Sequence, residues 1–360
     1  MSGIRLIESG VHPTEVEQPY SECPLCGFRT PGRLGTIASY QMPGSHPVFG
    51  CTACKAHFSL ANSGFEKIYE MIYRQRNAMP GYARYEYLAN NIRSENDPLL
   101  WLANQEDVYW GIREAVRLEA VRHQKLGKLK IVDMGCGLGY LTHALRTTGH
   151  DCTGLDISEE ATAAAKTRFG PYYETATIND YYSVKPSSPD IIVMAELIEH
   201  LVDPLSSLRD CIRCLSPSGA IIITTPNLDA YSASTVWVSD PPPVHLWLFS
   251  ENSLRVVAKM LGCDATFINF RNLNRSSFLP RELGLLAAPP VRPGFDANGN
   301  PMLHAVTLGL LARWSRTIRV RGPINRIRSL WQDAFHHSTR RPVMCCILRR
   351  KSQEILEKRE

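Results

Sequence analysis

The chain lacks the long apolar run that a membrane span needs. A transmembrane helix takes roughly 18 or more consecutive apolar residues, whereas the two best candidates here, residues 218–228 and 302–312, are short and contain polar side chains. Residues 1–20 carry three glutamates and no apolar stretch, so we expect no signal peptide. These absences predict a cytoplasmic protein without a transmembrane segment.

The composition also excludes several other classes of protein. Hydrophobic residues make up 44% of the 360 residues and charged residues 21%, which is ordinary for a globular chain and wrong for a fibrous or wholly disordered one. Eleven cysteines are too sparse, and too odd in number, for a small disulfide scaffold, so we expect reduced thiols. A chain of this length has room for one main domain and a small accessory module.

The periodicity of apolar residues changes along the chain. Helical spacing indicates helices from about residue 65, over 82–92 and from 98 to about 127, and from residue 128 short apolar runs alternate with helical stretches. This alternation predicts an α/β fold, a doubly wound and mostly parallel sheet with helices on both faces. The expected strands are 129–134, 152–157, 191–195, 220–224, 265–270 and 342–348. The expected helices between them are 141–147, 158–168, 204–215 and 253–261.

The same patterns give the expected domain boundaries. They are an N-terminal arm (1–20), a zinc ribbon (21–60), a helical lid or linker (61–127), the α/β core (128–272), a basic helical insertion (273–340), the last strand of the core (341–352) and a tail (353–360). The insertion is too long for a structureless loop. We expect it to contain helices at 302–313 and 324–335.

Four cysteines near the N-terminus have the spacing of metal ligands. Cys23 and Cys26 form one Cys-x-x-Cys turn, and Cys51 and Cys54 form a second. Two such turns supply four thiolates in a tetrahedral set, which suits Zn²⁺ and leaves no open position for chemistry. The alternatives are unrelated free thiols or a redox-active pair, but the thioredoxin-like strand and helix that a redox pair needs are missing here. We therefore expect a structural zinc site.

A glycine-rich turn follows the first expected strand of the core. Asp133 ends that strand, and Gly135, Gly137 and Gly139 lead into a helix at Tyr140. Glycines let the backbone approach a ligand closely, and amides at a helix start can donate hydrogen bonds to it. A dinucleotide-binding fingerprint needs a third glycine where this chain has Tyr140, which disfavours an NAD-binding domain.

The second expected strand ends with another acidic residue, Asp156. Nucleotide-binding sheets hold a ribose diol at this position, and Asp133 suggests a ligand with an amino group. The two acids together describe a nucleoside that carries an amino-acid tail. The stretches DMGCGLG, LDIS and AELIEHLVDP resemble the class I S-adenosylmethionine-dependent methyltransferases, over residues 128–271 and the last strand.

This resemblance implies a seven-stranded sheet and S-adenosylmethionine as the cofactor. Asp133 and the glycine turn would hold the methionine part, Asp156 would bind the ribose hydroxyls, and Ile157 and Ile178 would flank the adenine. The cofactor-binding set that it implies is Asp133, Gly135, Gly137, Gly139, Tyr140, Asp156, Ile157 and Ile178.

The fourth expected strand runs directly into Glu196-Leu-Ile-Glu199-His200. If a helical turn starts there, these three polar residues share one face above the carboxyl edge of the sheet, and a later loop can bring His245 to the same edge. A metal-bound hydroxyl loses its proton more easily and is oriented for attack on a methyl group. Without a metal, His200 or His245 can act as the base. A third possibility is that Glu196 contacts the cofactor while Glu199 and His200 pair with neighbours.

The motif is similar to that of two methyltransferase groups, the ubiquinone-biosynthesis O-methyltransferases and the small-RNA 3′-terminal ribose 2′-O-methyltransferases. The resemblance implies a divalent cation, Mg²⁺ or Mn²⁺, held by Glu196, Glu199, His200 and His245 against vicinal hydroxyls of the acceptor. It also implies that Glu199, His200 and His245 are catalytic. Two imidazoles suit Mn²⁺, Fe²⁺ or Zn²⁺ better than Mg²⁺.

We therefore expect an S-adenosylmethionine-dependent methyltransferase that modifies a hydroxyl of a sugar, a glycan or another small molecule with vicinal hydroxyls. Methylation of RNA ribose 2′-hydroxyls and methylation of sugar carbon are the alternative reactions. A cofactor-binding adaptor that keeps the fold without catalysis is the alternative outside enzymes, and the complete cofactor motif argues against it.

Basic residues are concentrated near the C-terminus. Residues 313–360 hold 13 Lys/Arg against 4 Asp/Glu, a net charge of +9, which leaves −4 for residues 1–312 of the chain's +5. Such a segment can contact an anionic membrane surface, nucleic-acid phosphates or a pyrophosphate-bearing substrate, or can simply be solvated. We expect that this segment can contact the surface of a membrane, and we do not favour nucleic acid as its partner.

Overall fold

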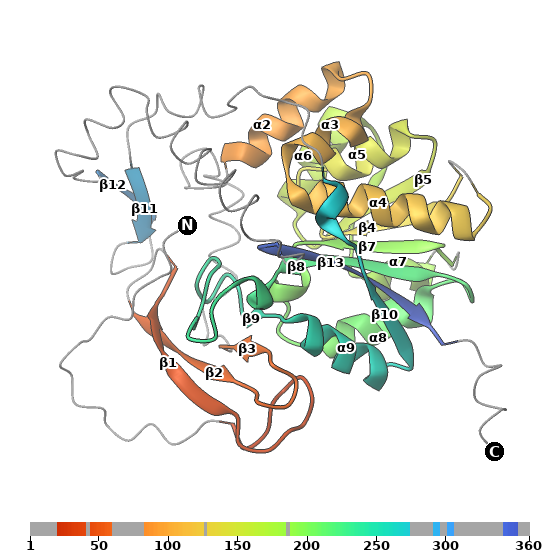
Figure 1. Ribbon diagram of the computed structural model, residues 1–360. Coiled ribbons are helices and arrows are strands. Elements are labelled where there is room, and N and C mark those ends of the chain that lie inside the picture. Colours follow the sequence, from red (N-terminus) through yellow and green to blue (C-terminus); the bar gives the residue numbers. More distant parts are fainter. Residues whose placement is uncertain are drawn as a thin grey trace, which may run out of the picture.

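The computed structural model describes residues 20–40, 44–59, 83–125, 128–184, 188–273, 291–295, 301–305 and 341–351. Its largest element is a seven-stranded sheet with the strand order β10-β13-β8-β7-β4-β5-β6 (Figure 1). The strands are β4 (Lys130–Met134), β5 (Asp151–Asp156), β6 (Tyr173–Thr175), β7 (Ile191–Ala195), β8 (Ala220–Pro226), β10 (Cys263–Phe267) and β13 (Val343–Arg350). Strands β4 to β8 are parallel, and β13 runs antiparallel between β8 and β10. The predicted doubly wound, mostly parallel sheet is confirmed.

Helices pack on both faces of this sheet (Figure 1). One face carries α2 (Ala83–Asn91), α3 (Pro98–Gln105), α4 (Asp107–Arg122), α5 (Tyr140–Thr147) and α6 (Glu159–Phe169), and the other carries α7 (Ile178–Val184), α8 (Pro204–Cys214) and α9 (Glu251–Met260). Ile131 packs in the core of the first face and its neighbour Val132 in the core of the second. Strands that are buried on both faces are apolar at most positions, which explains why the strand signals are nearly continuous apolar runs. In the described part of the chain, no helix combines the length and apolarity of a membrane span.

Polar caps determine where several helices begin. Asp203 accepts a hydrogen bond from the Ser206 amide at 2.8 Å, and Pro204 takes the first helical position of α8. Ser250 and Ser253 form a reciprocal capping box at the start of α9. Such caps satisfy amides that have no partner within the helix. Helix α8 begins at the predicted residue 204, and α9 begins at residue 251, two residues before its predicted start.

Three details differ from the sequence-based expectations. The helix expected after residue 98 is divided into α3 and α4, because Glu106 adopts an extended backbone with φ −142° and ψ 150°. The short strand β6 and the short helix α7 were not predicted, since neither is long enough to show a clear period. The helix expected from residue 65 lies outside the described residues.

The insertion before the last strand also differs from its prediction. A helix was expected at 302–313, but residues Pro301–Ala305 form strand β12, which pairs antiparallel with β11 (Val291–Phe295). The five residues between these strands include Asn298-Gly299, a pair typical of hairpin turns. The short apolar run from residue 302 onward fits a helical period as well as a strand, and the turn pair before it favours the hairpin. The second expected helix, 324–335, lies outside the described residues.

A smaller sheet is formed by the cysteine-rich segment together with a strand from the core. Its order is β1-β2-β3-β9, with β1 (Gly32–Ala38), β2 (Ser45–Gly50) and β3 (His57–Phe58) from the N-terminal segment and β9 (Trp247–Leu248) from the loop before α9. In Figure 1 these first three strands, in red and orange, lie beside the region around β9 and α9. The ribbon and the core therefore share one sheet.

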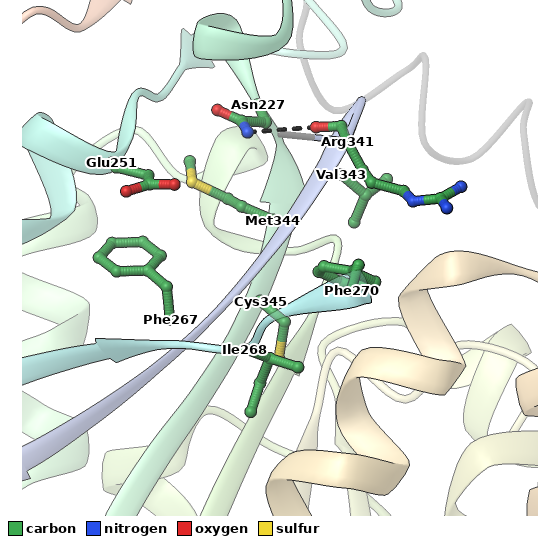
Figure 2. A pocket seen from close by; sticks show the side chains of 9 residues that line it. All are labelled: Asn227, Glu251, Phe267, Ile268, Phe270, Arg341, Val343, Met344 and Cys345. Atoms are coloured by element: carbon green, nitrogen blue, oxygen red, sulfur yellow. Dashed lines mark hydrogen bonds between the residues drawn. The ribbon is translucent and has the colours of Figure 1, made fainter. Parts of the chain in front are cut away.

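The last strand is anchored where it enters the large sheet. Asn227, at the end of β8, donates from Nδ2 to the Arg341 carbonyl at 3.1 Å and from its amide to the Pro342 carbonyl at 2.8 Å. Figure 2 shows this contact at the rim of a small pocket that Glu251, Phe267 and Met344 also line. The anchor places β13 in register with β8 from Val343 onward.

Candidate active site

The four N-terminal cysteines come together as their spacing predicts. Their sulfur atoms lie within 4.8 Å of one another, with 3.9 Å between Cys23 and Cys54 and 3.6 Å between Cys26 and Cys51. None of the four is in a disulfide bond, and all but Cys26 are buried. Four convergent thiols with no other polar ligand are a donor set for a tetrahedral metal ion.

The glycine turn after β4 has a backbone that other residues adopt with strain. Gly135, Gly137 and Gly139 have φ values of 75°, 50° and 81°. At Gly139 a Cβ atom would also lie 2.6 Å from the Tyr173 ring and 2.7 Å from Ala165. The Tyr173 hydroxyl donates to the Gly139 carbonyl at 2.8 Å, which fixes the turn against β6. The glycines are therefore required by backbone conformation and by close packing.

The two acidic residues at the strand tips are held by groups of the chain itself. Asp133 is buried, accepts a hydrogen bond from the Thr142 hydroxyl at 2.7 Å, and has its pKa raised to about 6 by that burial. Asp156 accepts from the Gly137 amide and from the Ser158 amide, both at 2.9 Å. Asp156 thus joins the glycine turn to the end of β5, and both acids shape the turn before any ligand arrives.

The remaining predicted cofactor residues divide into exposed and buried ones. Ile157 follows Asp156 and is 80% exposed, so an apolar side chain stands uncovered at the carboxyl edge of the sheet. Ile178 is 3% exposed and belongs to the core beneath that edge. Tyr140 is bonded through its hydroxyl to the Tyr109 hydroxyl at 2.6 Å. Of these three, the exposed Ile157 offers the clearest surface for a flat ligand.

The acidic and imidazole residues expected after β7 lie partly as predicted. The segment turns into a short 3-10 helix, Ile198–His200, and one carboxylate oxygen of Glu199 and one ring nitrogen each of His200 and His245 lie within 4.8 Å of one another. The two imidazole rings meet edge to face at 4.5 Å. Glu196 is not in this group of three. Its backbone has φ 49°, a rare value for a residue with a side chain, and its amide donates to the Thr224 carbonyl.

Backbone contacts fix the members of this acid–imidazole cluster (Glu199, His200 and His245). His200 Nδ1 lies 2.8 Å from the Val244 carbonyl, which requires the proton on that nitrogen. The Glu199 carbonyl accepts from the Leu246 amide at 2.8 Å, and Oε2 of Glu199 accepts from the Thr225 hydroxyl at 3.0 Å. The loop that carries His245 is therefore tied directly to the turn that carries the other two residues.

Burial dominates the electrostatics of the cluster. It raises the pKa of Glu199 well above its usual range and that of Glu196 to about 7, and it lowers the pKa of His200 to about 4. The pKa of His245 is also well below its usual value, because of burial and of the adjacent His200. Both imidazoles are therefore neutral at pH 7.

Several buried polar atoms around the cluster have no hydrogen-bond partner in the structure. They are Oε1 of Glu196, Oε1 of Glu199 and Nδ1 of His245. An unpartnered buried carboxylate oxygen is costly, and a bound cation or a ligand hydroxyl would satisfy it. Two neutral imidazoles and a carboxylate are a suitable donor set for a divalent transition-metal ion.

Residues beside Glu196 were not placed in the site by the sequence. Arg84 on α2 bonds the Tyr85 hydroxyl at 2.8 Å and forms an ion pair with Glu106 at 3.5 Å. The charges of Glu106 and Arg84 act on Glu196 in opposite directions, the first raising its pKa and the second lowering it. The tyrosine-rich composition of residues 82–110 was a signal, but at helical spacing it is equally typical of packing. The break between α3 and α4 brings Glu106 to this position.

Most of the C-terminal arginines expected to form a basic surface lie outside the described residues. Among the described ones, Arg349 donates to Oε1 of Glu119, a fully buried carboxylate of α4, at 2.8 Å. Arg350 donates to the Leu215 carbonyl at 3.3 Å. These two arginines attach β13 to its neighbours. Their positive charges therefore hold the last strand in place.

Comparison with known proteins agrees with this geometry. Residues 104–266 match a family described as a methyltransferase domain. The ubiquinone biosynthesis O-methyltransferase of Thiobacillus denitrificans is 32% identical over 108 residues, 29% of this chain and 47% of that protein. That of Methylococcus capsulatus is 32% identical over 160 residues, 42% of this chain and 62% of that protein. The matches span about half the length of these relatives, and they confirm the resemblance to class I methyltransferases for this part of the chain.

Solved structures are similar at lower identity. A methyltransferase from Archaeoglobus fulgidus, described as dependent on S-adenosylmethionine, is 19% identical, with a TM-score of 0.38 over 66% of this chain and 94% of that one. The plantazolicin methyltransferase BamL is 13% identical, with a TM-score of 0.40 over 79% of this chain and 96% of that one.

Proposed function

We propose that this protein is an S-adenosylmethionine-dependent O-methyltransferase whose acceptor carries adjacent hydroxyl groups, as a sugar or a catechol-like ring does. The observation that carries the proposal is the meeting of two motifs at one edge of the sheet. Strands β4, β5 and β7 are parallel neighbours, so the glycine turn and the acid–imidazole cluster both follow carboxyl ends. Between them, Leu197 lies so close to Gly135 that a Cβ there would be 2.9 Å from the leucine side chain.

The chain's residues at the tips of β4 and β5 fit the cofactor. S-adenosylmethionine supplies a methyl group on a positively charged sulfur. Asp156 would hold the ribose hydroxyls, the uncovered Ile157 would support the adenine, and the Gly135–Gly139 turn would admit the methionine part. Asp133 stabilises that turn through Thr142 and places a buried negative charge behind it.

The acid–imidazole cluster would orient and deprotonate the acceptor. A divalent cation held by Glu199, His200 and His245 would polarise two adjacent hydroxyls, and the unpartnered oxygen and nitrogen atoms there fit such an ion. Neutral imidazoles with lowered pKa values are weak bases by themselves. This weakness favours cation assistance over direct proton removal by His200 or His245. Glu196, beside the acid–imidazole cluster, would add a second carboxylate to the site.

The resemblance to ubiquinone biosynthesis O-methyltransferases supports oxygen as the acceptor atom and a ring diol as one acceptor class. We further propose that Cys23, Cys26, Cys51 and Cys54 bind a structural Zn²⁺, because four thiolates saturate a tetrahedral ion and leave no position for a substrate. The metal that assists catalysis and the metal that stabilises the ribbon would thus occupy separate sites.

Calorimetry with S-adenosylmethionine on the full chain tests the first half of this proposal, and a micromolar dissociation constant is the expected result. Transfer of a labelled methyl group to catechol and to methyl glucoside tests the second half. Exhaustive chelation should suppress transfer by a factor of about 100 or more while leaving cofactor binding intact, and Mn²⁺ should restore it. Absence of cofactor binding would overturn the proposal. Full transfer after chelation would assign the reaction to His200 and His245 without a cation, and labelling of a short RNA instead of both diols would replace the acceptor class.

A further inference from the structure

We infer that the cysteine ribbon is a positioning element of the candidate active site, because it holds the segment that carries His245. The inference rests on the proposed function for the role of His245, while the coupling itself rests on contacts within this chain. Zinc in the ribbon would then control the acceptor half of the site and leave the cofactor half unaffected.

Backbone pairing is the first link. In the shared small sheet His57 pairs with Leu248 and Phe58 pairs with Trp247, two positions beyond His245. The Ser59 amide donates to the Leu246 carbonyl at 2.9 Å, next to His245 itself. Further upstream, the Tyr40 amide donates to the Pro242 carbonyl at 2.9 Å. The ribbon therefore holds the loop on both sides of this histidine.

Packing is the second link. The Phe58 and Trp247 rings lie 5.4 Å apart, and both residues are fully buried. Three of the ribbon cysteines (Cys23, Cys51 and Cys54) and these aromatic residues belong to one hydrophobic core with Phe249, and Cys26 packs against that core. Trp247 also donates from Nε1 to the Leu201 carbonyl at 2.8 Å, directly after His200. A change in the ribbon core is thus transmitted to both histidines through a single tryptophan.

A side-chain clamp is the third link. Asn252, in the first turn of α9, donates from Nδ2 to the carbonyls of Ala53 and Cys54 at 3.1 and 3.0 Å. These carbonyls belong to the second Cys-x-x-Cys turn, whose shape depends on the ion that its thiolates would bind. Asn252 joins that turn to the end of the loop that starts after β8 and contains His245.

The cofactor side has no comparable dependence on the ribbon in the described residues. The Asp133 and Asp156 carboxylates are bonded within the β4–α5–β5 unit, by Thr142, Gly137 and Ser158. Loss of the ribbon should therefore impair the placement of the acceptor base and leave cofactor binding intact. In a generally damaged enzyme both properties usually fail together.

Two variants of the full chain test the inference. Cys51→Ser removes one thiolate, and Asn252→Ala keeps all four thiolates but removes the clamp. Asn91→Ala is the matched control, because its amide donates to the Tyr87 carbonyl on an exposed helix away from the ribbon. The measurements are zinc content, amide hydrogen exchange over residues 242–249, S-adenosylmethionine affinity and methyl transfer to catechol.

In Cys51→Ser we expect zinc loss, exchange over residues 242–249 faster by a factor of about 100, and a cofactor dissociation constant within about threefold of the parent. In Asn252→Ala zinc should stay bound and exchange there should rise about tenfold, since two hydrogen bonds are lost. Methyl transfer should fall in the same order, and Asn91→Ala should resemble the parent. Unchanged exchange over 242–249 in the zinc-free variant would overturn the inference. If exchange changes as expected but the parent binds no cofactor, the proposed function fails and the coupling stands.

Discussion

The two halves of the candidate site satisfy their polar groups in opposite ways. At the tips of β4 and β5, Asp133 and Asp156 are bonded to a hydroxyl and two amides of their own neighbourhood. Glu199, just beyond β7, and His245, in the loop after β8, each keep a buried atom with no partner. The first half is therefore preorganised before a ligand binds. The second half contains buried polar atoms without a hydrogen-bond partner, which a bound ion or ligand would satisfy. Neighbouring strands of one sheet can thus carry one site that recognises its ligand by shape and a second site that recognises its ligand by charge.

The largest expected effect separates these halves at the acid–imidazole cluster. Replacing His200 by Ala removes one donor and the contact with the Val244 carbonyl, so methyl transfer to catechol should fall by a factor of about 1,000 or more. S-adenosylmethionine affinity, measured by calorimetry, should stay within about twofold. His150→Ala is the matched control, because this buried histidine precedes β5 at the opposite edge of the sheet and should retain transfer. Equal losses in the two variants would contradict a specific role for His200.

A change at Asp156 should produce the reverse pattern. The two carboxylate oxygens of Asp156 accept hydrogen bonds from the Gly137 and Ser158 amides. In Asp156→Asn only one side-chain oxygen remains as an acceptor for these two amides. We expect S-adenosylmethionine affinity to fall by a factor of about 10 to 100 by calorimetry. Mn²⁺ binding at the acid–imidazole cluster, followed by electron paramagnetic resonance, should persist. Asp151→Asn, at the other end of β5 on a 70% exposed side chain, is the control, and a loss of Mn²⁺ binding in Asp156→Asn would mean that the two halves are not independent.

The smallest expected effect concerns stability and its pH dependence. The pKa of Asp133 is raised to about 6 by burial, so the folded state binds this proton more tightly than the unfolded chain does. Ionisation between about pH 4 and 6 therefore destabilises the fold. Asp133→Asn should raise the free energy of unfolding by about 1–3 kcal/mol at pH 7.5. Urea denaturation should show that this gain becomes small near pH 4.5, and a gain that grows toward acid pH would contradict the assignment. The same variant should bind the cofactor more weakly.

The sequence predicted most of the core elements in their correct order and type. Strand β7 begins and ends at the predicted residues, because Ile191–Ala195 is a continuous apolar run buried on both faces. The glycine turn was equally predictable, since a strand, an acid and alternate glycines specify the backbone. β6 was missed because three residues carry no measurable period. The strand at 301–305 was mistaken for a helix because a short apolar run fits either period.

The site was predicted less completely than the fold. Helical spacing placed Glu196, Glu199 and His200 on one face, but the segment forms a 3-10 turn after a residue at φ 49°, and Glu196 is directed into a different set of neighbours. Glu106, which forms an ion pair with Arg84 among those neighbours, lies where the chain leaves the helix between α3 and α4. A single extended residue has no signature in a hydrophobic pattern, so such a contact depends on tertiary structure.

The sharing of a sheet by the ribbon and the core was also beyond sequence reasoning. β3 and β9 contain two residues each and lie far apart in the chain. No local pattern identifies pairing partners of that length, and the cysteine spacing predicts a metal site that is complete by itself. Because of the shared sheet, the ribbon is more than an appended module. It also helps to hold the loop that carries His245.

The position of β13 has a consequence for how the chain is made. This strand is the last described element, yet it lies between β8 and β10 and is the only partner of β10 among the described strands. During synthesis on the ribosome, β8 therefore waits with an open hydrogen-bonding edge while more than a hundred residues follow it, until Val343–Arg350 has emerged. An unpaired edge in a nascent chain invites association with other strands. The maturing polypeptide should accordingly depend on protection by chaperones until Val343–Arg350 has been synthesised.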